Sequence, residues 1–162
     1  RGWDLDPVVG PHVLDRDRRF GYLAGSDADR AADLQSAWCD PSVDAVGGMT
    51  MGADPIAVST AVAGAGRGLR AFSVRKEAKD HGTGGRVVGP VGAGDRVAII
   101  EDTTTTGSAA FEAMEAVRAE GIEVVQVLTL VDRSSGDAAR RFEAAGVPFL
   151  RLFEPADLGV NG

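Results

Sequence analysis

Residues 96–110, Arg-Val-Ala-Ile-Ile-Glu-Asp-Thr-Thr-Thr-Thr-Gly-Ser-Ala-Ala, constrain the fold of this chain more than any other stretch. The apolar run 97–100 predicts a strand that is buried on both faces. Two carboxylates stand where that strand is expected to end, and a loop of hydroxyl side chains with one glycine then leads into an alanine-rich helix. Such a loop points backbone N–H groups and the positive end of a helix toward one place, which is typical of a phosphate site.

The acid pair Glu101-Asp102 changes the ligand that this loop is expected to hold. Carboxylates repel phosphate, but they accept hydrogen bonds from sugar hydroxyls. The stretch therefore predicts a site for a phosphorylated sugar, with the phosphate on the loop and the ribose on the acids. An ordinary strand–loop–helix junction with Thr and Ser as caps is one alternative. A flavodoxin-like FMN loop is another, although such loops usually follow the first strand of a chain and lack the acid pair.

Apolar runs and helical patterns alternate along the rest of the chain. Strands are expected at 43–46, 69–74, 97–100, 124–131 and 148–153, and helices at 26–39, 54–64, 108–120 and 136–145. This alternation predicts an α/β fold with a mostly parallel open sheet flanked by helices. Residues 75–94 carry charge and six glycines without periodicity, so we expect a long mobile loop or a loose hairpin there.

Composition excludes several classes of protein. The net charge of −7 disfavours a nucleic-acid partner, which normally meets a basic face. The chain has no run of 18 apolar residues, so we expect no membrane span. Cys39 is the only cysteine, which excludes an intramolecular disulfide and favours a reducing cytoplasm. The chain opens without a signal segment or an initiator Met, so we expect a front end that is truncated or processed.

The two lysines stand out among the basic residues. Of the 17 basic residues 15 are Arg, and the lysines are Lys76 and Lys79, within Arg-Lys-Glu-Ala-Lys-Asp-His-Gly at 75–82. A chain that otherwise uses Arg has reason to keep Lys where a compact, mobile ammonium is needed. Three cations and His81 would clamp a diphosphate and help it to leave. A solvated run of charge is the alternative.

Two further loops are expected at the carboxyl ends of strands, where open parallel sheets bind ligands. Residues 47–54 hold clustered glycines, which let a backbone approach a ligand closely, or form a plain strand-to-helix turn. Arg133 follows the strand expected at 124–131 and could pair with a carboxylate or carbonyl at two points. A surface Asp-Arg pair is the alternative for residues 132–133.

These motifs resemble those of one enzyme family. Residues 96–110 resemble the phosphoribosyl-diphosphate (PRPP) signature of type I phosphoribosyltransferases, and residues 75–82 resemble the catalytic loop of the orotate phosphoribosyltransferases, which have a similar Asp-Arg after the next strand. The resemblance covers roughly residues 43–160, including the closing Asp157-Leu158-Gly159. It fails over residues 1–40, where the family has a hood with a Ser-Gly segment and paired aromatics. Trp3, Phe20 and Tyr22 are either substitutes for those aromatics or core residues.

The resemblance implies a type I phosphoribosyltransferase fold and a role for each matched residue. The expected reaction is Mg²⁺-dependent transfer of 5-phosphoribosyl from PRPP to orotate, which gives orotidine 5′-phosphate and diphosphate. The expected catalytic residues are Lys79, His81 and Asp102, and orotate is expected on Thr105 and Arg133. PRPP is expected on Arg75, Lys76, Lys79, His81, Glu101, Asp102, Thr103, Thr104, Thr105, Thr106, Gly107 and Ser108, with the diphosphate loop at Gly48, Met49, Thr50 and Met51.

The resemblance also implies how the chain is organised and assembled. We expect one phosphoribosyltransferase domain over residues 1–162, with an atypical region at 1–40 and a PRPP-binding core at 43–160. We expect a homodimer in which the loop 75–85 reaches the neighbouring active site. Mg²⁺ ligands are expected mostly from substrate and water. The alternatives are transfer to a different acceptor, or a non-catalytic regulator of this fold that binds nucleotide or RNA.

Overall fold

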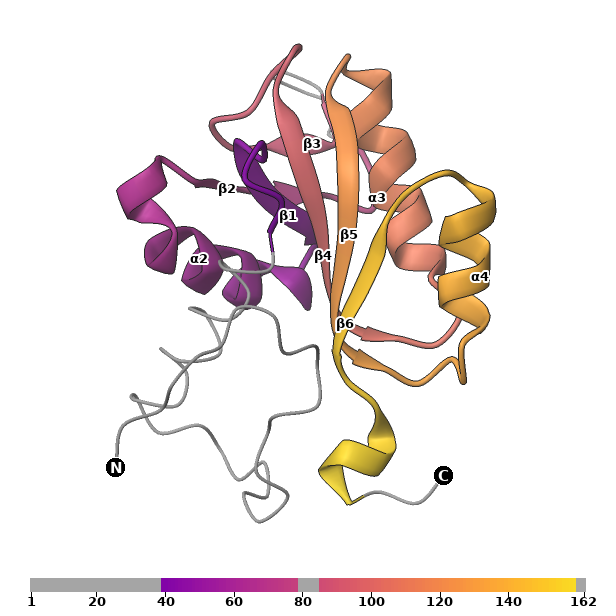
Figure 1. Cartoon of the computed structure of the whole chain (residues 1–162). Coiled ribbons are helices and arrows are strands. Elements are labelled where there is room, and N and C mark those ends of the chain that lie inside the picture. Colours follow the sequence, from indigo (N-terminus) through magenta and orange to yellow (C-terminus); the bar gives the residue numbers. More distant parts are fainter. Residues whose placement is uncertain (1–38, 79–84, 160–162) are drawn as a thin grey trace, which may run out of the picture.

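The computed structural model describes residues 39–78 and 85–159, which form one six-stranded sheet with helices on both faces (Figure 1). The strands are β1 (Ala45–Met49), β2 (Arg70–Val74), β3 (Val87–Val88), β4 (Arg96–Thr104), β5 (Glu123–Asp132) and β6 (Phe149–Phe153). The helices are α2 (Ala53–Ala63), α3 (Ser108–Ala119) and α4 (Asp137–Ala144), with short 3-10 turns η1 (Ala65–Arg67) and η2 (Pro155–Leu158).

The strand order is β3-β2-β1-β4-β5-β6. Every neighbouring pair is parallel except β2 and β3, which pair antiparallel at one edge. The predicted α/β fold with a mostly parallel open sheet is therefore confirmed. Because β4, β5 and β6 run in the same direction, their carboxyl ends lie together at the lower edge of the sheet in Figure 1.

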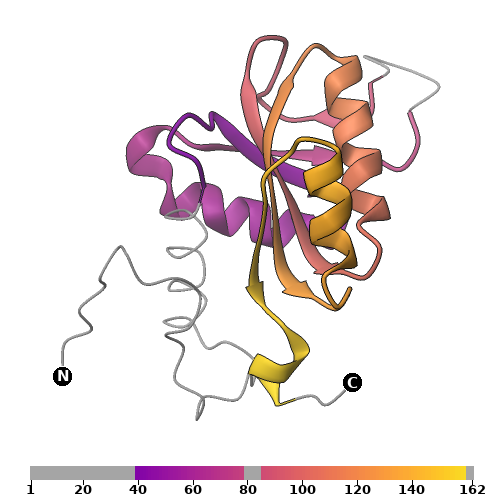
Figure 2. The same cartoon turned by 45° about the vertical axis from the view of Figure 1, so that its right-hand side comes forward.

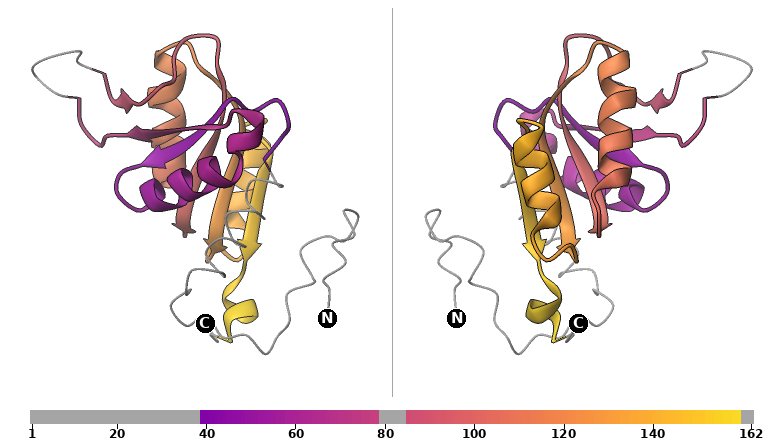
Figure 3. Two further views of the ribbon diagram at one scale, coloured as in Figure 1. Left: turned by 90° about the vertical axis from the view of Figure 1, so that its left-hand side faces the viewer. Right: turned by 90° about the vertical axis from the view of Figure 1, so that its right-hand side faces the viewer.

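Helices cover both faces of this sheet, which is why its strands are apolar throughout. In β4, Val97 and Ile99 pack with α3 and α4 in one buried cluster, whereas Ala98 and Ile100 pack with α2 in a second cluster. Figures 2 and 3 show α2 on one side of the sheet and α3 with α4 on the other. Phe142 of α4 stacks between Phe111 of α3 and Phe149 of β6, at centroid distances of 4.5 and 4.9 Å.

Some element boundaries differ from those predicted. The central strand was expected to end at Ile100, but β4 continues to Thr104 because residues 101–104 stay paired with β5. The first strand is β1 at Ala45–Met49 and not 43–46, so Gly47 and Gly48 lie inside a strand. The predicted helix at 26–39 lies outside the described residues.

Two local expectations also changed. The helix expected at 54–64 begins one residue earlier, at Ala53, and the Asp54 carboxylate accepts a 2.8 Å hydrogen bond from Ser73 Oγ of β2. The region 75–94 was predicted as a mobile loop or loose hairpin, and its described part is a hairpin stem in which Val87 pairs with Val74. No helix within residues 39–78 and 85–159 is long and apolar enough to cross a membrane.

Candidate active site

The candidate active site lies where four loops leave the carboxyl ends of parallel strands. One loop follows β1 and enters α2, a second follows β2, a third joins β4 to α3, and a fourth joins β5 to α4. Parallel pairing of β2, β1, β4 and β5 brings the four loops to one edge. This edge is where open α/β sheets bind ligands, and all the described residues of the sequence-based site lie in or beside these loops.

Close packing places the first loop. A Cβ atom on Gly48 would lie 2.0 Å from the Ile100 carbonyl oxygen, and one on Gly47 would lie 2.3 Å from the Phe72 carbonyl oxygen. Side chains at these positions would push β1 away from β4 and β2. The Thr50 N–H donates to the Val74 carbonyl at 2.9 Å, and the peptide bond between Thr50 and Met51 is cis. The glycines that the sequence suggested for ligand approach thus serve strand packing at 47 and 48.

Asp102 connects the first loop to the third. A Cβ on Gly52 would lie 2.7 Å from Asp102 Oδ2, so the carboxylate lies directly against the backbone at the start of α2. Asp102 is exposed, and its Oδ1 accepts a 2.7 Å hydrogen bond from the Thr103 N–H. A side chain at position 52 would displace the carboxylate from this place. Asp102 is therefore an accessible acceptor at the meeting point of two loops.

Glu101, the other acid, has a drier environment. Its carboxylate accepts a hydrogen bond from the Thr104 hydroxyl, and Thr104 itself is fully buried. Burial raises the pKa of Glu101, and the nearby charges of Asp102 and Asp132 raise it further, against the Thr104 hydrogen bond. Two neighbouring acids therefore differ in character, since Asp102 faces solvent and Glu101 is partly buried. Such divergence is common at functional sites.

The third loop, residues 105–107, presents hydroxyls just before α3. Thr105, Thr106 and Ser108 are exposed, and the Thr106 and Ser108 hydroxyls lie 2.8 Å apart. Gly107 adopts a left-handed conformation at φ 74°, and a Cβ there would lie 3.0 Å from the Phe142 ring. The loop thus needs glycine for both its backbone conformation and its packing. The exposed hydroxyls and the first N–H groups of α3 form a surface suited to an anion.

The second loop supplies the cations of the sequence-based site. Arg75 and Lys76 follow β2 directly, whereas Lys79 and His81 lie outside the described residues. The stem of the hairpin is held by Arg86, whose Nε donates to the Arg75 carbonyl at 2.8 Å and whose Nη2 contacts Glu112 Oε1 at 2.6 Å. The Arg75 N–H returns a 2.8 Å hydrogen bond to the Arg86 carbonyl. The stem is therefore fixed to α3.

The fourth loop is tied to the third. The Arg133 N–H donates to the Thr104 carbonyl at 2.7 Å, which leaves the Arg133 side chain exposed at the carboxyl edge. Asp132 is 2% exposed and accepts a 2.8 Å hydrogen bond from the Ser134 N–H through Oδ1. Among the described residues, Asp132 Oδ2 has no partner. Ser134 Oγ in turn accepts from the Ala138 N–H of α4 at 3.0 Å.

Sequence reasoning missed two arginines beside the third loop, Arg140 and Arg141, and the role of Arg86. The Arg141 guanidinium donates to the Thr106 carbonyl and lies 4.8 Å from the centre of the Phe111 ring. With Arg140 and Thr105 it borders a hollow of about 350 Å³. Nothing in the local sequence of α4 distinguishes these arginines from a solvated helix face, because the contact joins residues 35 positions apart.

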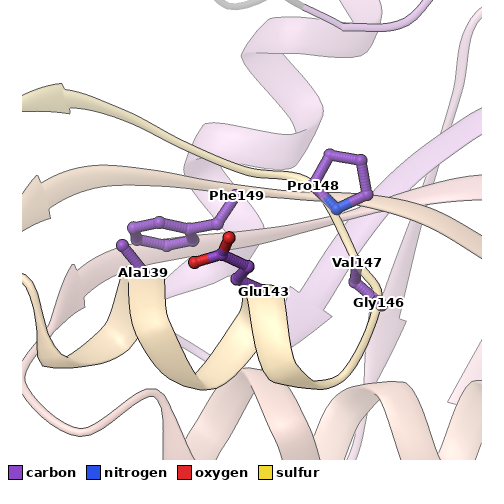
Figure 4. A pocket seen from close by; sticks show the side chains of 6 residues that line it. All are labelled: Ala139, Glu143, Gly146, Val147, Pro148 and Phe149. Carbon is purple, nitrogen blue, oxygen red and sulfur yellow. The ribbon is translucent and has the colours of Figure 1, made fainter.

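A second hollow, of about 340 Å³, lies between α4 and the start of β6 (Figure 4). Its lining is mostly apolar, with Glu143 as the one charged member, and it includes Pro148 and Phe149 at the amino end of β6. Parallel strands place this end opposite the carboxyl edge, so the hollow is separate from the candidate site.

The fold and the site together define a type I phosphoribosyltransferase: a mostly parallel sheet, an acid pair at the end of its central strand, and a hydroxyl-rich loop before a helix. Comparison with known proteins gives the family within this class. The chain belongs to the orotate phosphoribosyltransferase family. It is 51% identical to the orotate phosphoribosyltransferase of Streptomyces coelicolor over 163 residues, which cover 99% of this chain and 86% of that protein.

Other relatives agree. The orotate phosphoribosyltransferase of Corynebacterium glutamicum is 50% identical over 128 residues, which cover 79% of this chain and 68% of that protein. The crystal structure of the Mycobacterium tuberculosis orotate phosphoribosyltransferase with Fe(III) dicitrate superimposes with a TM-score of 0.75 at 40% identity, covering 85% of this chain and 78% of that one. A phosphoribosyltransferase from Corynebacterium diphtheriae gives a TM-score of 0.74 at 41% identity, covering 85% of this chain and 80% of that one.

The N-terminal part of the chain matches a different family. Residues 1–55 match the LD-carboxypeptidase N-terminal domain. A 46-residue stretch is 83% identical to a putative carboxypeptidase of Streptomyces coelicolor, and it covers 28% of this chain and 15% of that protein. The family's hood pattern was not found in residues 1–40, and this same region has a peptidase-type sequence.

Proposed function

We propose that this chain transfers the 5-phosphoribosyl group of PRPP to a ring nitrogen of orotate and releases diphosphate. The observation that carries this proposal is Asp102, an exposed carboxylate held against Gly52 of the first loop and next to the hydroxyl-rich third loop. Family membership adds support, as does the Mycobacterium tuberculosis orotate phosphoribosyltransferase solved with PRPP, which is 40% identical with a TM-score of 0.67. We take residues 43–160 as the PRPP-binding core.

In the proposed mechanism the C1–O bond to diphosphate breaks while the bond from orotate nitrogen to C1 forms. Thr105, Thr106 and Ser108 hold the 5′-phosphate, and Asp102 accepts hydrogen bonds from the ribose hydroxyls. Arg75 and Lys76 face the diphosphate, with Lys79 and His81 from the same loop. The developing charge is an oxocarbenium-like cation on the sugar, so stabilising the departing diphosphate is the main task of the protein.

The donor set fits a magnesium ion held mainly by substrate. No group of three His, Cys, Asp or Glu side chains gathers into a metal site within the described ranges. Asp102 is an exposed carboxylate at the carboxyl edge, and hard oxygen ligands from diphosphate and water complete the usual Mg²⁺ shell. When bound, the ion neutralises charge on the leaving diphosphate.

The acceptor is assigned through Arg133. Its side chain is exposed at the carboxyl edge, and its backbone N–H is fixed to Thr104 beside the acids. A guanidinium can hold the orotate carboxylate at two points. Transfer to a different base would keep the donor half of the site and change only this contact. The measurement that separates these cases is diphosphate release from PRPP with a panel of bases.

Orotate should support release, and uracil, which lacks the carboxylate, should be a poor substrate. Loss of a charged partner costs on the order of 2–5 kcal/mol, so Arg133→Ala should raise the KM for orotate far more than the KM for PRPP. Arg151→Ala, an exposed-face control on β6 that pairs with Glu154, should change neither value. Release with another base but not with orotate would contradict the orotate assignment. RNA binding without any release would favour the regulator alternative.

We also propose a homodimer in which the loop 75–85 reaches the neighbouring site, in a cytoplasmic enzyme. A row of apolar side chains along the outer face of α2 supports the dimer. Met51, Val58 and Val62 are 82%, 53% and 71% exposed, and Pro55 lies exposed between them. This row follows helical spacing and continues directly from the first loop of the site. A helix that is apolar on both faces needs a second partner surface.

A further inference from the structure

Two families of sequence meet in this chain. The match to a putative carboxypeptidase covers 28% of the chain at 83% identity, and the Corynebacterium glutamicum transferase covers 79% at 50% identity. The peptidase-type match, over residues 1–55, reaches the start of α2. The N-terminal part is therefore closer in sequence to a peptidase than the remainder is to these transferases.

The peptidase-type part stands in place of a transferase N-terminus and is not added in front of one. The Streptomyces coelicolor transferase aligns with 99% of this chain, and 86% of its own length is covered. An added segment would leave a large part of this chain without a counterpart there. The comparison therefore indicates substitution of one N-terminal part by another of similar length.

Residues 39–46 show how such a part joins the core. The N–H of Asp44 donates to the Arg96 carbonyl at 2.7 Å, and the Arg70 N–H donates to the Asp44 carbonyl at 3.0 Å. Val43 and Val46 are buried against α2 and β4. Backbone hydrogen bonds and apolar contacts of this kind need only an extended apolar segment in register, which many unrelated strands provide. A segment from an unrelated protein can therefore lead into β1 and complete this sheet.

The part of the chain that we assign to PRPP binding begins immediately after Val46. Gly47 and Gly48 pack against the Phe72 and Ile100 carbonyl oxygens, and Gly52 makes room for Asp102. These contacts are specific to the partners that β2 and β4 provide. All the described residues that we assign to PRPP lie after Val46.

We propose that this chain is a composite, joined at β1. A peptidase-type segment, residues 1–46, replaces the N-terminal part of a transferase that would contact the acceptor base, while the PRPP-binding part from Gly47 onward stays complete. The proposal rests on the proposed function. Its consequence is a specific imbalance: the chain binds PRPP as its relatives do and binds orotate more weakly, because the N-terminal part has a peptidase-type sequence and lacks the hood pattern of the transferases. Arg133 is left as the main contact with the acceptor.

The test compares three full-length proteins: this chain, the Streptomyces coelicolor orotate phosphoribosyltransferase, and an exchange variant. The variant carries, in place of residues 1–46, the part of the Streptomyces coelicolor protein that precedes the counterpart of Gly47. PRPP binding is measured by calorimetry without orotate, and the KM for orotate is measured by diphosphate release. We expect PRPP dissociation constants that agree within about threefold, and a KM for orotate at least about tenfold lower in the exchange variant than in this chain.

Equal KM values for orotate in this chain and the exchange variant would overturn the proposal. PRPP binding that is much weaker in this chain than in the exchange variant would also overturn it. If neither protein released diphosphate with orotate although both bound PRPP, the proposed function would fail instead. Should the exchange variant not fold, replacing only residues 1–38 leaves residues 39–46 and their contacts with the sheet in place and makes the same comparison.

Discussion

At the scale of single residues, the two acids of the central strand, Glu101 and Asp102, lie in different environments. Asp102 lies exposed against Gly52, where it can meet a ligand. Glu101 is partly buried and bonded to the Thr104 hydroxyl, and its pKa is raised by burial and by Asp102 and Asp132. Adjacent carboxylates on a strand point to opposite faces, and the helices on those faces differ. A carboxylate is thus open to solvent at one position and carries a cost in stability at the next.

Asp102→Asn should impair PRPP use while the fold survives. Asparagine keeps an oxygen for the Thr103 N–H and nearly the same volume beside Gly52, so the melting temperature should stay close to that of the unmodified protein. Losing a charged acceptor for ribose hydroxyls costs about 1.5–3 kcal/mol, so kcat/KM for PRPP should fall roughly tenfold to a hundredfold. Lost thermal stability with normal kinetics in the folded fraction would contradict the ribose role.

Glu101→Gln should stabilise the protein at neutral pH. Because the folded-state pKa of Glu101 is raised above its value in the unfolded chain, the folded state holds this proton more tightly. The free energy of unfolding therefore falls as pH rises between those two pKa values, and the full penalty remains above them.

Thermal unfolding of Glu101→Gln as a function of pH checks this sign. Its advantage in melting temperature should be largest near pH 7.5, should shrink as the pH falls through the raised folded-state pKa of Glu101, and should be lost below about pH 4.3, the ordinary pKa of a glutamate. Glu115→Gln on the exposed face of α3 serves as the matched control and should show no such trend. An advantage that grows on acidification would refute the assignment.

At the scale of elements, β1 has no room for a side chain at Gly47 or Gly48. Its glycines face carbonyl oxygens of β2 and β4, and backbone atoms of a sheet cannot move aside as a flexible side chain can. The element therefore depends on two residues that local strand preference disfavours. Their presence is explained by tertiary packing at the edge that carries the site.

Gly48→Ala should destabilise the protein by about 1–3 kcal/mol or more, since the new methyl group would meet the Ile100 carbonyl oxygen at 2.0 Å. Gly66→Ala in η1 is the control, because a Cβ there meets no atom within 4 Å, and its effect should stay within about 0.5 kcal/mol. Urea unfolding of both variants makes the comparison. Equal stability of the two would show that β1 can shift away from β4.

At the scale of the whole molecule, charge and apolar surface point to different partners. The chain is acidic overall, yet the site collects Arg75, Lys76, Arg133 and Arg141 near one edge. Small anionic substrates fit that arrangement. The apolar row on α2, which continues directly from the first loop of the site, instead fits a protein surface.

Replacing Val58 and Val62 together by Asp should weaken the proposed dimer. Both side chains are exposed on α2, so charges there cost little in the isolated chain but oppose contact with a second apolar face. Sedimentation should show twice the 16.7 kDa chain mass for the unmodified protein and a dissociation constant at least about tenfold weaker for the variant. Leu150→Asp on β6, 39% exposed at the far edge of the sheet, should leave the dimer unchanged. A monomeric unmodified protein would remove the dimer proposal.

The sequence by itself determined the class of fold and named the residues of a candidate site. Apolar runs such as 97–100 and glycines and acids at strand ends are local signals, because burial on both faces and loop conformation are set by neighbouring residues. Glu101, Asp102 and residues 105–108 could therefore be named in advance. Even the N-terminal departure from the family was visible, as a pattern that was missing.

Only the tertiary structure decided how far β4 extends, which glycines serve packing and which serve the site, and which acid is buried. Residues 101–104 stay in the strand because β5 pairs with them, and the absence of a side chain at Gly52 leaves room for the Asp102 carboxylate. Arg86 and Arg141 hold loops through contacts with residues 11 and 35 positions away. These properties depend on atoms brought together by the fold, so no local pattern in the sequence could carry them.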